Sequence, residues 1–367
     1  MEKNYLYRAT LLLLFLFLFF SGLYYARDFI VPIAISILLA MVLLPITKRL
    51  EKAGVPRLIS VILCLLVIIG LIAGIIILFY SQVVAFAQDL PHIKVTLIEK
   101  FKLLQNFVES KTNISAQQQM NWIELRYNDL INSSGQYVRM LLMGITGGLA
   151  IFGLIIFYIL FFLLYRVRIN NFFLQLVSDD KHAKVESIIC KITDLIQHYL
   201  TGLLIELAVL GTLNAIGLLI LGIRQAIFLG YLAGLLNIIP YVGSMIGSIF
   251  PIMMALIFGD SLTTVVAVMA LMATTQFIDN NILTPKIIGS HIQINPLVTI
   301  MGIVSGGFIW GIPGMIMFVP LLGIFKIICD NLDPLKPIGY LLGDDAPTSN
   351  TGLLKRIKNL FHKTPTA

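Results

Sequence analysis

With 367 residues, of which 58% are hydrophobic and only 12% charged, the chain has the composition of an integral membrane protein. Soluble domains carry about 25% charged residues, and the mean hydropathy of +0.93 excludes an ordinary globular domain. The net charge of +7 does not indicate a nucleic-acid partner, because the basic residues lie mostly beside apolar runs, where membrane orientation and lipid headgroups account for them.

Residues 1–82 are predicted to contain three membrane spans, over Ala9 to Ala26, Phe29 to Thr47 and Leu58 to Gln82. The first run is longer than the apolar region of a signal peptide and no small-x-small cleavage site follows it, so we expect it to be retained. In the loop after the second run a single acid, Glu51, accompanies four bases: Lys48, Arg49, Lys52 and Arg57. The positive-inside rule places this loop, and with it the N-terminus, in the cytoplasm.

The middle of the chain alternates between polar and apolar segments. Residues 83–140 are more polar and carry apolar side chains at helical spacing, so we predict an extramembrane helical segment on the periplasmic side. Residues 141–165 form the predicted fourth span, and residues 166–200 a cytoplasmic helical segment that starts with Arg166 and Arg168. Residues 201–328 are predicted to be a transport core with broken helices, and residues 329–367 a cytoplasmic tail.

This pattern predicts an all-α, polytopic transmembrane helical protein with about eight membrane segments, some of them Pro/Gly-broken or re-entrant. We expect both termini in the cytoplasm, so the number of crossings is even. Two arrangements remain open. Either eight spans exist and each broken run crosses once, or six full crossings are accompanied by re-entrant hairpins.

Two apolar runs in the core are interrupted by proline and glycine: NIIPYVGSMIGSIFP, from Asn237 to Pro251, and GIVSGGFIWGIPGMIMFVP, from Gly302 to Pro320. Pro240 lacks the N–H that would bond the carbonyl of Leu236 in a helix. An unpaired backbone group in lipid costs several kcal/mol, so such a break needs protein or a watery cavity beside it. Paired broken segments are typical of a transporter's substrate site, and packing by glycine alone is the alternative.

Two acids within apolar surroundings are candidates for function, because intramembrane charges are costly. Glu206 lies in the predicted fifth span, Gly202 to Gly222, and Asn214, eight residues further along, is on nearly the same helix face. The alternative is an interfacial acid, or one bonded to a neighbouring helix. Asp279 lies in the densest polar cluster beside an apolar run, and the alternative is a helix-ending turn. The other polar members of that cluster are Gln276, Asn280, Asn281, Thr284 and Lys286.

Catalysis is not expected. A Ser–His protease would need both residues within membrane spans, and Ser305 has no such partner, because His198 and His291 fall in polar segments at span edges. There is no HExxH, and no GxxxxGK[ST] that would bind ATP. Three scattered cysteines indicate neither a disulfide framework nor a metal site. We therefore predict no enzyme, no catalytic residue, no cofactor and no metal, and transport that is passive or driven by an ion gradient.

Three stretches resemble the signature blocks of the autoinducer-2 exporter (AI-2E) family of bacterial membrane proteins: NIIPYVGSMIGSIFP, FIDNNILTPKIIGSHIQINPLV and SGGFIWGIPGMIMFVPL. Members often have an acid where this chain has Asn237. The resemblance implies a multi-pass permease of the bacterial inner (cytoplasmic) membrane that assembles as a homo-oligomer, for example a pentamer. It is carried by Pro240, Tyr241, Gly243, Asp279, Pro285, Gly289, Pro296, Gly306, Gly311, Gly314 and Pro320.

The leading hypothesis is therefore a permease that exports a small polar metabolite such as the quorum-sensing signal autoinducer-2. The alternative is a Na⁺/H⁺ antiporter in which Glu206 or Asp279 binds a proton or Na⁺, and an intramembrane enzyme is a remote third. Partners are the solute, protons or sodium ions, membrane lipids and copies of the same chain. The expected substrate pathway comprises Asn237, Pro240, Tyr241, Gly243, Gln276, Asp279, Asn280, Asn281, Gly306, Gly311 and Gly314.

Overall fold

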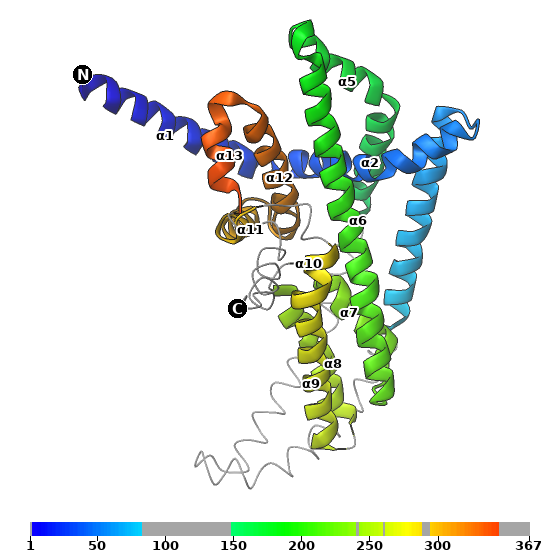
Figure 1. Ribbon diagram of the computed structural model, residues 1–367. Coiled ribbons are helices and arrows are strands. Elements are labelled where there is room, and N and C mark those ends of the chain that lie inside the picture. The colour runs from blue at the N-terminus through cyan, green and yellow to red at the C-terminus, as the bar shows by residue number, and fades with distance from the viewer. Residues whose placement is uncertain (1, 83–147, 240–241, 260, 288–293, 345–367) are drawn as a thin grey trace, which may run out of the picture.

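The structure is a computed structural model that describes residues 2–82, 148–239, 242–259, 261–287 and 294–344 (Figure 1). All elements in these ranges are helices, apart from one isolated bridge between Ile294 and Gly343. The predicted all-α fold is thus confirmed. The periplasmic segment predicted at residues 83–140 lies outside the described residues, as does the part of the predicted cytoplasmic tail beyond residue 344.

The first half of the chain forms α1 (Glu2–Tyr25), α2 (Arg27–Lys52), a helix over Arg57–Gln82, a helix over Gly148–Leu164, α5 (Arg166–Gln175) and α6 (His182–Ile220). The second half forms α7 (Ala226–Leu236), α8 (Val242–Phe258), α9 (Leu262–Ile278), the π-helical turn η2 (Asp279–Leu283), α10 (Thr284–Ile287), α11 (Pro296–Trp310), α12 (Ile312–Asn331) and α13 (Lys336–Leu342). Short 3-10 turns cover Asp179–Lys181 and Asp333–Leu335. Five of the described helices are long and apolar enough to cross a membrane, or six if the bent pair Gly148–Leu164 and Arg166–Gln175 is one span.

The first two helices follow each other without a reversal. Helical hydrogen bonds continue across the junction, from the Ala26 N–H to the Gly22 carbonyl and from the Ile30 N–H to the Ala26 carbonyl. In Figure 1, α1 and α2 accordingly run onward in one general direction. Two antiparallel spans would need a turn at this point, so the structure differs here from the arrangement expected for residues 9–47.

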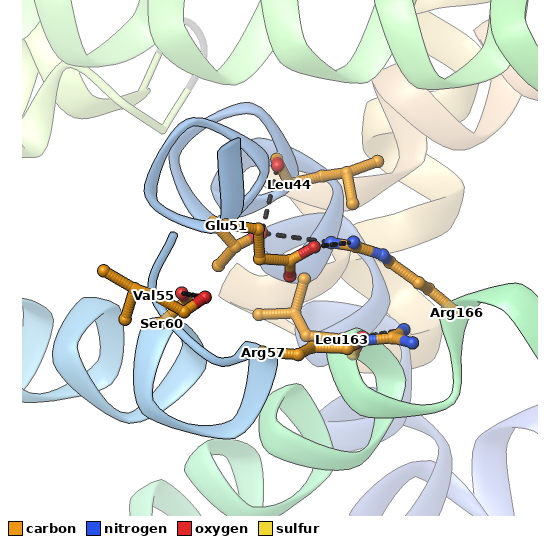
Figure 2. Close-up of polar contacts among 8 residues, drawn as sticks. Leu44, Glu51, Val55, Arg57, Ser60, Leu163 and Arg166 are labelled. Atoms are coloured by element: carbon orange, nitrogen blue, oxygen red, sulfur yellow. Dashed lines mark hydrogen bonds and ion pairs between the residues drawn. The ribbon is translucent and has the colours of Figure 1, made fainter. Parts of the chain in front are cut away.

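A polar clasp joins the ends of four helices (Figure 2). Glu51, at the end of α2, forms an ion pair with Arg166, at the start of α5. The guanidinium of Arg57 donates a 2.7 Å hydrogen bond to the carbonyl of Leu163, at the end of the helix Gly148–Leu164. The two basic segments predicted to be cytoplasmic, at residues 48–57 and 166–168, therefore lie together on one side of the molecule.

Helix α6 is the longest helix among the described residues, and α2, α7, α9 and α12 all pack against it (Figure 1). Its 39 residues extend for about 58 Å at 1.5 Å per residue, about twice the thickness of a bilayer core. The part of the predicted cytoplasmic segment from His182 to Leu200 and the predicted fifth span belong to this one continuous helix, whereas the residues before His182 form α5 and a 3-10 turn. The expected boundary between residues 200 and 201 therefore falls inside a single element.

Each of the two Pro/Gly-broken runs folds as a helical hairpin. In the first, α7 and α8 lie against each other, and a Cβ on Gly247 would lie 3.0 Å from the Cα of Ala233. A Cβ on Gly243 would collide with the carbonyl of Leu236, so only glycine permits this reversal. The Leu236 carbonyl itself accepts a 2.9 Å hydrogen bond from the N–H of Ile239, so Pro240 does not leave it unpaired as the sequence predicted.

The second hairpin turns at Gly311, whose φ of +66° lies in the left-handed region that favours glycine. Its helices α11 and α12 meet where Gly306 and Gly314 face each other so closely that a Cβ on either would collide with the other's carbonyl. Because the chain reverses at both breaks, neither run passes straight through as one continuous span. Helix α12 is itself long and apolar enough to cross a membrane, whereas α7, α8 and α11 are shorter apolar helices.

The two hairpins occupy successive stretches of α6. The α7–α8 hairpin packs on its C-terminal half, where Gly230 approaches the backbone of Ala215. The α11–α12 hairpin packs on its N-terminal half, where Gly323 approaches Leu195, and Val319 shares a buried cluster with Tyr199. The side chain of Glu206 lies between these two stretches of α6.

Candidate functional site

Two buried carboxyl groups meet at the junction of the two hairpins. Glu206, from α6, is 7% exposed, and Asp279, the first residue of the π-helical turn η2, is 2% exposed. The two carboxyl groups lie close enough for the charge of each to affect the other. The residues lie 73 positions apart in the sequence, so the fold builds the acid pair from two distant segments. Both candidates for ion or proton coupling thus belong to one site.

Three neutral side chains donate hydrogen bonds to this pair. Asn237, at the C-terminal end of α7, donates through Nδ2 to Oδ2 of Asp279 at 2.9 Å. Thr284, the first residue of α10, donates through its hydroxyl to Oε1 of Glu206 at 2.9 Å. Gln276 reaches Oδ2 of Asp279 at 3.5 Å. The site therefore combines side chains from α6, from the tip of the α7–α8 hairpin, and from the end of α9 with the segment that follows it.

The π-helical turn explains how Asp279 points into the protein. The DNNIL segment carries one extra residue per turn, and helix resumes as TPKI with Thr284. Such π-turns inside helices are common at functional sites because they re-aim side chains. The alternative considered from sequence, a helix-ending turn, is wrong, because helix continues on both sides of these residues. For Glu206, bonding to a neighbouring helix is confirmed by Thr284.

Each carboxyl group keeps one oxygen without a hydrogen-bond donor. Among the described residues, Oε2 of Glu206 and Oδ1 of Asp279 are buried and unpartnered. Two facing carboxylates cannot both stay ionised in a low-dielectric interior unless a positive charge or a proton lies between them. This arrangement can hold a shared proton, a monovalent cation, or the hydroxyl groups of a polar solute.

The remaining predicted pathway residues separate into two groups. Asn280 is exposed and accepts a 3.2 Å hydrogen bond from Gln276, and Asn281 is exposed and bonds only the Phe277 carbonyl of its own helix. Gly243 lies in the α7–α8 hairpin near the site. Gly306, Gly311 and Gly314 form the turn and seam of the other hairpin, and they contribute close packing with no polar side chain.

The proline and glycine positions expected to be structural have varied settings. Pro296 opens α11, Pro320 is buried inside α12, and Pro285 is exposed in α10. Pro240, Tyr241 and Gly289 lie outside the described residues. Sequence reasoning did not single out Tyr199, a buried residue on the same face of α6 as Glu206. Its position seven residues before Glu206, two helical turns on one face, was the available signal. In the described ranges, no cluster of three or more His, Cys, Asp or Glu suits a metal ion.

The chain is similar to known membrane transport proteins over most of its length. The sequence model of the AI-2E family transporters matches residues 13–333. AI-2 transport protein TqsA of Escherichia coli K12 is 25% identical over 340 residues, which cover 92% of this chain and 96% of its own length. Two Bacillus subtilis proteins carry the name "Putative transport protein". YueF is 28% identical, covering 82% of this chain and 83% of its own, and YrrI is 23% identical, covering 82% and 86%.

Proposed function

Because the chain belongs to the AI-2E transporter family, and is thus a multi-pass membrane transport protein and not an enzyme, we propose that it exports a small, highly polar metabolite of the autoinducer-2 kind. The solute passes along α6 through the junction where Glu206 and Asp279 meet. Asn237 and Gln276 contact the solute beside them, and the α7–α8 hairpin borders its route.

The observation that carries this proposal is the buried polar site itself. Five polar side chains from three separate segments meet inside a protein in which 58% of residues are hydrophobic, and two of their oxygens have no donor among the described residues. A purely structural role would not require this, because unpaired buried acceptors are destabilising. A polar solute or ion that passes through the junction supplies the missing partners.

A second function is favoured by the acid pair. Two carboxyl groups that can share one proton suit exchange of H⁺ for Na⁺, and the sequence alone had not shown that Glu206 and Asp279 come together. In this second proposal the protein is a monovalent cation/proton antiporter. The two proposals are compatible if export of the solute is coupled to movement of a proton at the pair Glu206 and Asp279.

The protein's setting in the cell also follows from the proposed function. We place it in the bacterial inner membrane with the clasp on the cytoplasmic side, because the clasp gathers the bases Arg57 and Arg166 and the positive-inside rule assigns such a side to the cytoplasm. We also expect copies of the chain to assemble as a homo-oligomer in the membrane. Each copy carries its own acid pair.

Flux from sealed liposomes tests these proposals against each other. Purified protein is reconstituted, autoinducer-2 and a pH dye are enclosed, and an inward Na⁺ gradient is imposed or omitted. Escape of the signal faster than from protein-free liposomes supports export. A Na⁺-dependent change of internal pH without escape of the signal contradicts export and supports the antiporter. If neither occurs, both proposals fail.

A further inference from the structure

A third buried polar oxygen lies further along α6. Asn214 is 3% exposed, and its Oδ1 has no hydrogen-bond donor among the described residues. It follows Glu206 by eight residues in the same helix, which corresponds to about 12 Å. Asn214 is thus separate from the acid pair but lies along the same helix.

The packing around α6 shows which way Asn214 faces. Its neighbours Gly211 and Ala215 contact α7, through Tyr231 and Gly230, whereas Gly217 contacts Leu271 of α9. Asn214 lies between these two directions on the helix surface, so it faces the seam where α7 and α9 both meet α6. Asp279 follows α9, and Asn237 ends α7. The same seam therefore leads from Asn214 to the acid pair.

A purely apolar layer follows Asn214 in the seam. Leu218, one turn further along α6, is fully buried in a cluster whose other buried members are Ile223, Ala226, Leu229, Met254, Ala255, Val268 and Met272. A leucine at position 214 would extend this apolar packing and avoid an unpaired amide oxygen. The presence of asparagine at that position is therefore not explained by packing.

The unpaired atoms of the seam share one chemistry. Oδ1 of Asn214, Oε2 of Glu206 and Oδ1 of Asp279 are all acceptors, so the missing partners are hydrogen-bond donors. A neutral solute with several hydroxyl groups supplies donors at both positions. An anion of similar size would bring further acceptors and meet the acid pair with the same sign of charge.

We propose that Asn214 is a second solute-contacting position on the transport route, beyond the acid pair, and that the seam between α6, α7 and α9 selects neutral polyhydroxylated solutes over anions. This inference rests on the proposed function only in assuming that the junction conducts a solute. It does not depend on the solute being autoinducer-2.

Cysteine accessibility tests the position without a transport assay. Cys64, Cys190 and Cys329 are first replaced by alanine, and Asn214→Cys is introduced into the full-length protein in liposomes. Ile216→Cys is the depth-matched control, because Ile216 is 50% exposed on the same part of α6. Ile196→Cys, at a fully buried position of α6 in another cluster, controls for local opening.

A water-soluble, positively charged methanethiosulfonate should modify Asn214→Cys about tenfold faster than either control, because only a thiol that meets water forms the reactive thiolate. Excess ribitol should slow this reaction, whereas gluconate, an anion of similar size, should not. Equal rates at Asn214→Cys and the two controls would contradict a place for Asn214 on the solute route. Equal protection by gluconate and ribitol would contradict the selection of neutral solutes over anions. Fast, ribitol-protected labelling in a protein that does not release autoinducer-2 would contradict only the cargo of the proposed function.

Discussion

Asn237 and Asp279 are joined by a 2.9 Å hydrogen bond between the tip of the α7–α8 hairpin and the π-helical turn that follows α9. This contact ties a segment interrupted by proline to one of the two buried acids. It gives the α7–α8 hairpin a defined position relative to the acid pair.

Replacing Asn237 by leucine should reduce solute flux by about tenfold or more, because a hydrogen bond to a charged group contributes about 1.5–3 kcal/mol. Leucine keeps the approximate size of the side chain but leaves Oδ2 of Asp279 with only the longer contact from Gln276. Initial rates of efflux from liposomes measure the effect. The matched control is Asn281→Leu, because Asn281 is exposed and bonds only its own helix. Similar losses in both variants would show that the Asn237 contact has no special role.

The acid pair should behave as one unit. Glu206→Gln keeps an acceptor for Thr284, and Asp279→Asn keeps an acceptor for Asn237, while each removes one ionisable group. We expect either variant to abolish coupling between solute flux and internal pH, and the double variant to be little worse than the single ones, because neighbouring groups are not additive. Glu186→Gln, at an exposed position near the start of α6, serves as the control. If the loss in the double variant equalled the product of the losses in the two single variants, the two acids would act separately.

Alanine at Gly306 should destabilise the protein, because its Cβ would be forced against the Gly314 carbonyl and the Phe318 ring. Overpacking of this kind costs about 1–3 kcal/mol. The thermal unfolding midpoint in detergent should fall accordingly. Gly70→Ala has open space around the added Cβ, and it should leave the midpoint unchanged or raise it, since alanine favours helix by up to about 1 kcal/mol. A fall of equal size in both variants would mean that helical glycine itself, and not the close seam, determines stability.

The clasp in Figure 2 should respond to single and double substitution differently. Glu51→Met leaves Arg166 without its carboxylate in a largely buried position, with an expected cost on the order of 2 kcal/mol. Adding Arg166→Met should recover part of that loss, because the unpaired charge is then removed. Thermal unfolding in detergent of Glu51→Met, Arg166→Met and the double variant gives a double-mutant cycle. Lys48→Met, at an exposed position, is the control. A double variant that is as unstable as the sum of the two single variants would contradict a direct pairing.

Composition and span pattern were sufficient to predict a helical, polytopic membrane protein, because apolar length and charge placement follow directly from the bilayer. Glu206 and Asp279 were each recognisable as costly acids in apolar surroundings. Because they lie far apart in the sequence, no local pattern could show that they meet. That meeting depends on how α9 packs against α6. At the π-helical turn, a helix-ending turn was an open alternative because Asp-Asn-Asn followed by Thr-Pro is typical of turns. Both chain reversals at the glycine-rich breaks depend on backbone contacts far apart in sequence, such as Gly306 with Gly314.

The most direct test of the account is the rate at which liposomes containing wild-type protein or Asp279→Asn release enclosed autoinducer-2, with equal amounts of folded protein confirmed by gel filtration. The account predicts release by the wild type and a rate at least about tenfold lower in the variant, because a route through the acid pair loses the charged partner of Asn237 and Gln276. Equal release by both proteins would contradict a solute route through Glu206 and Asp279.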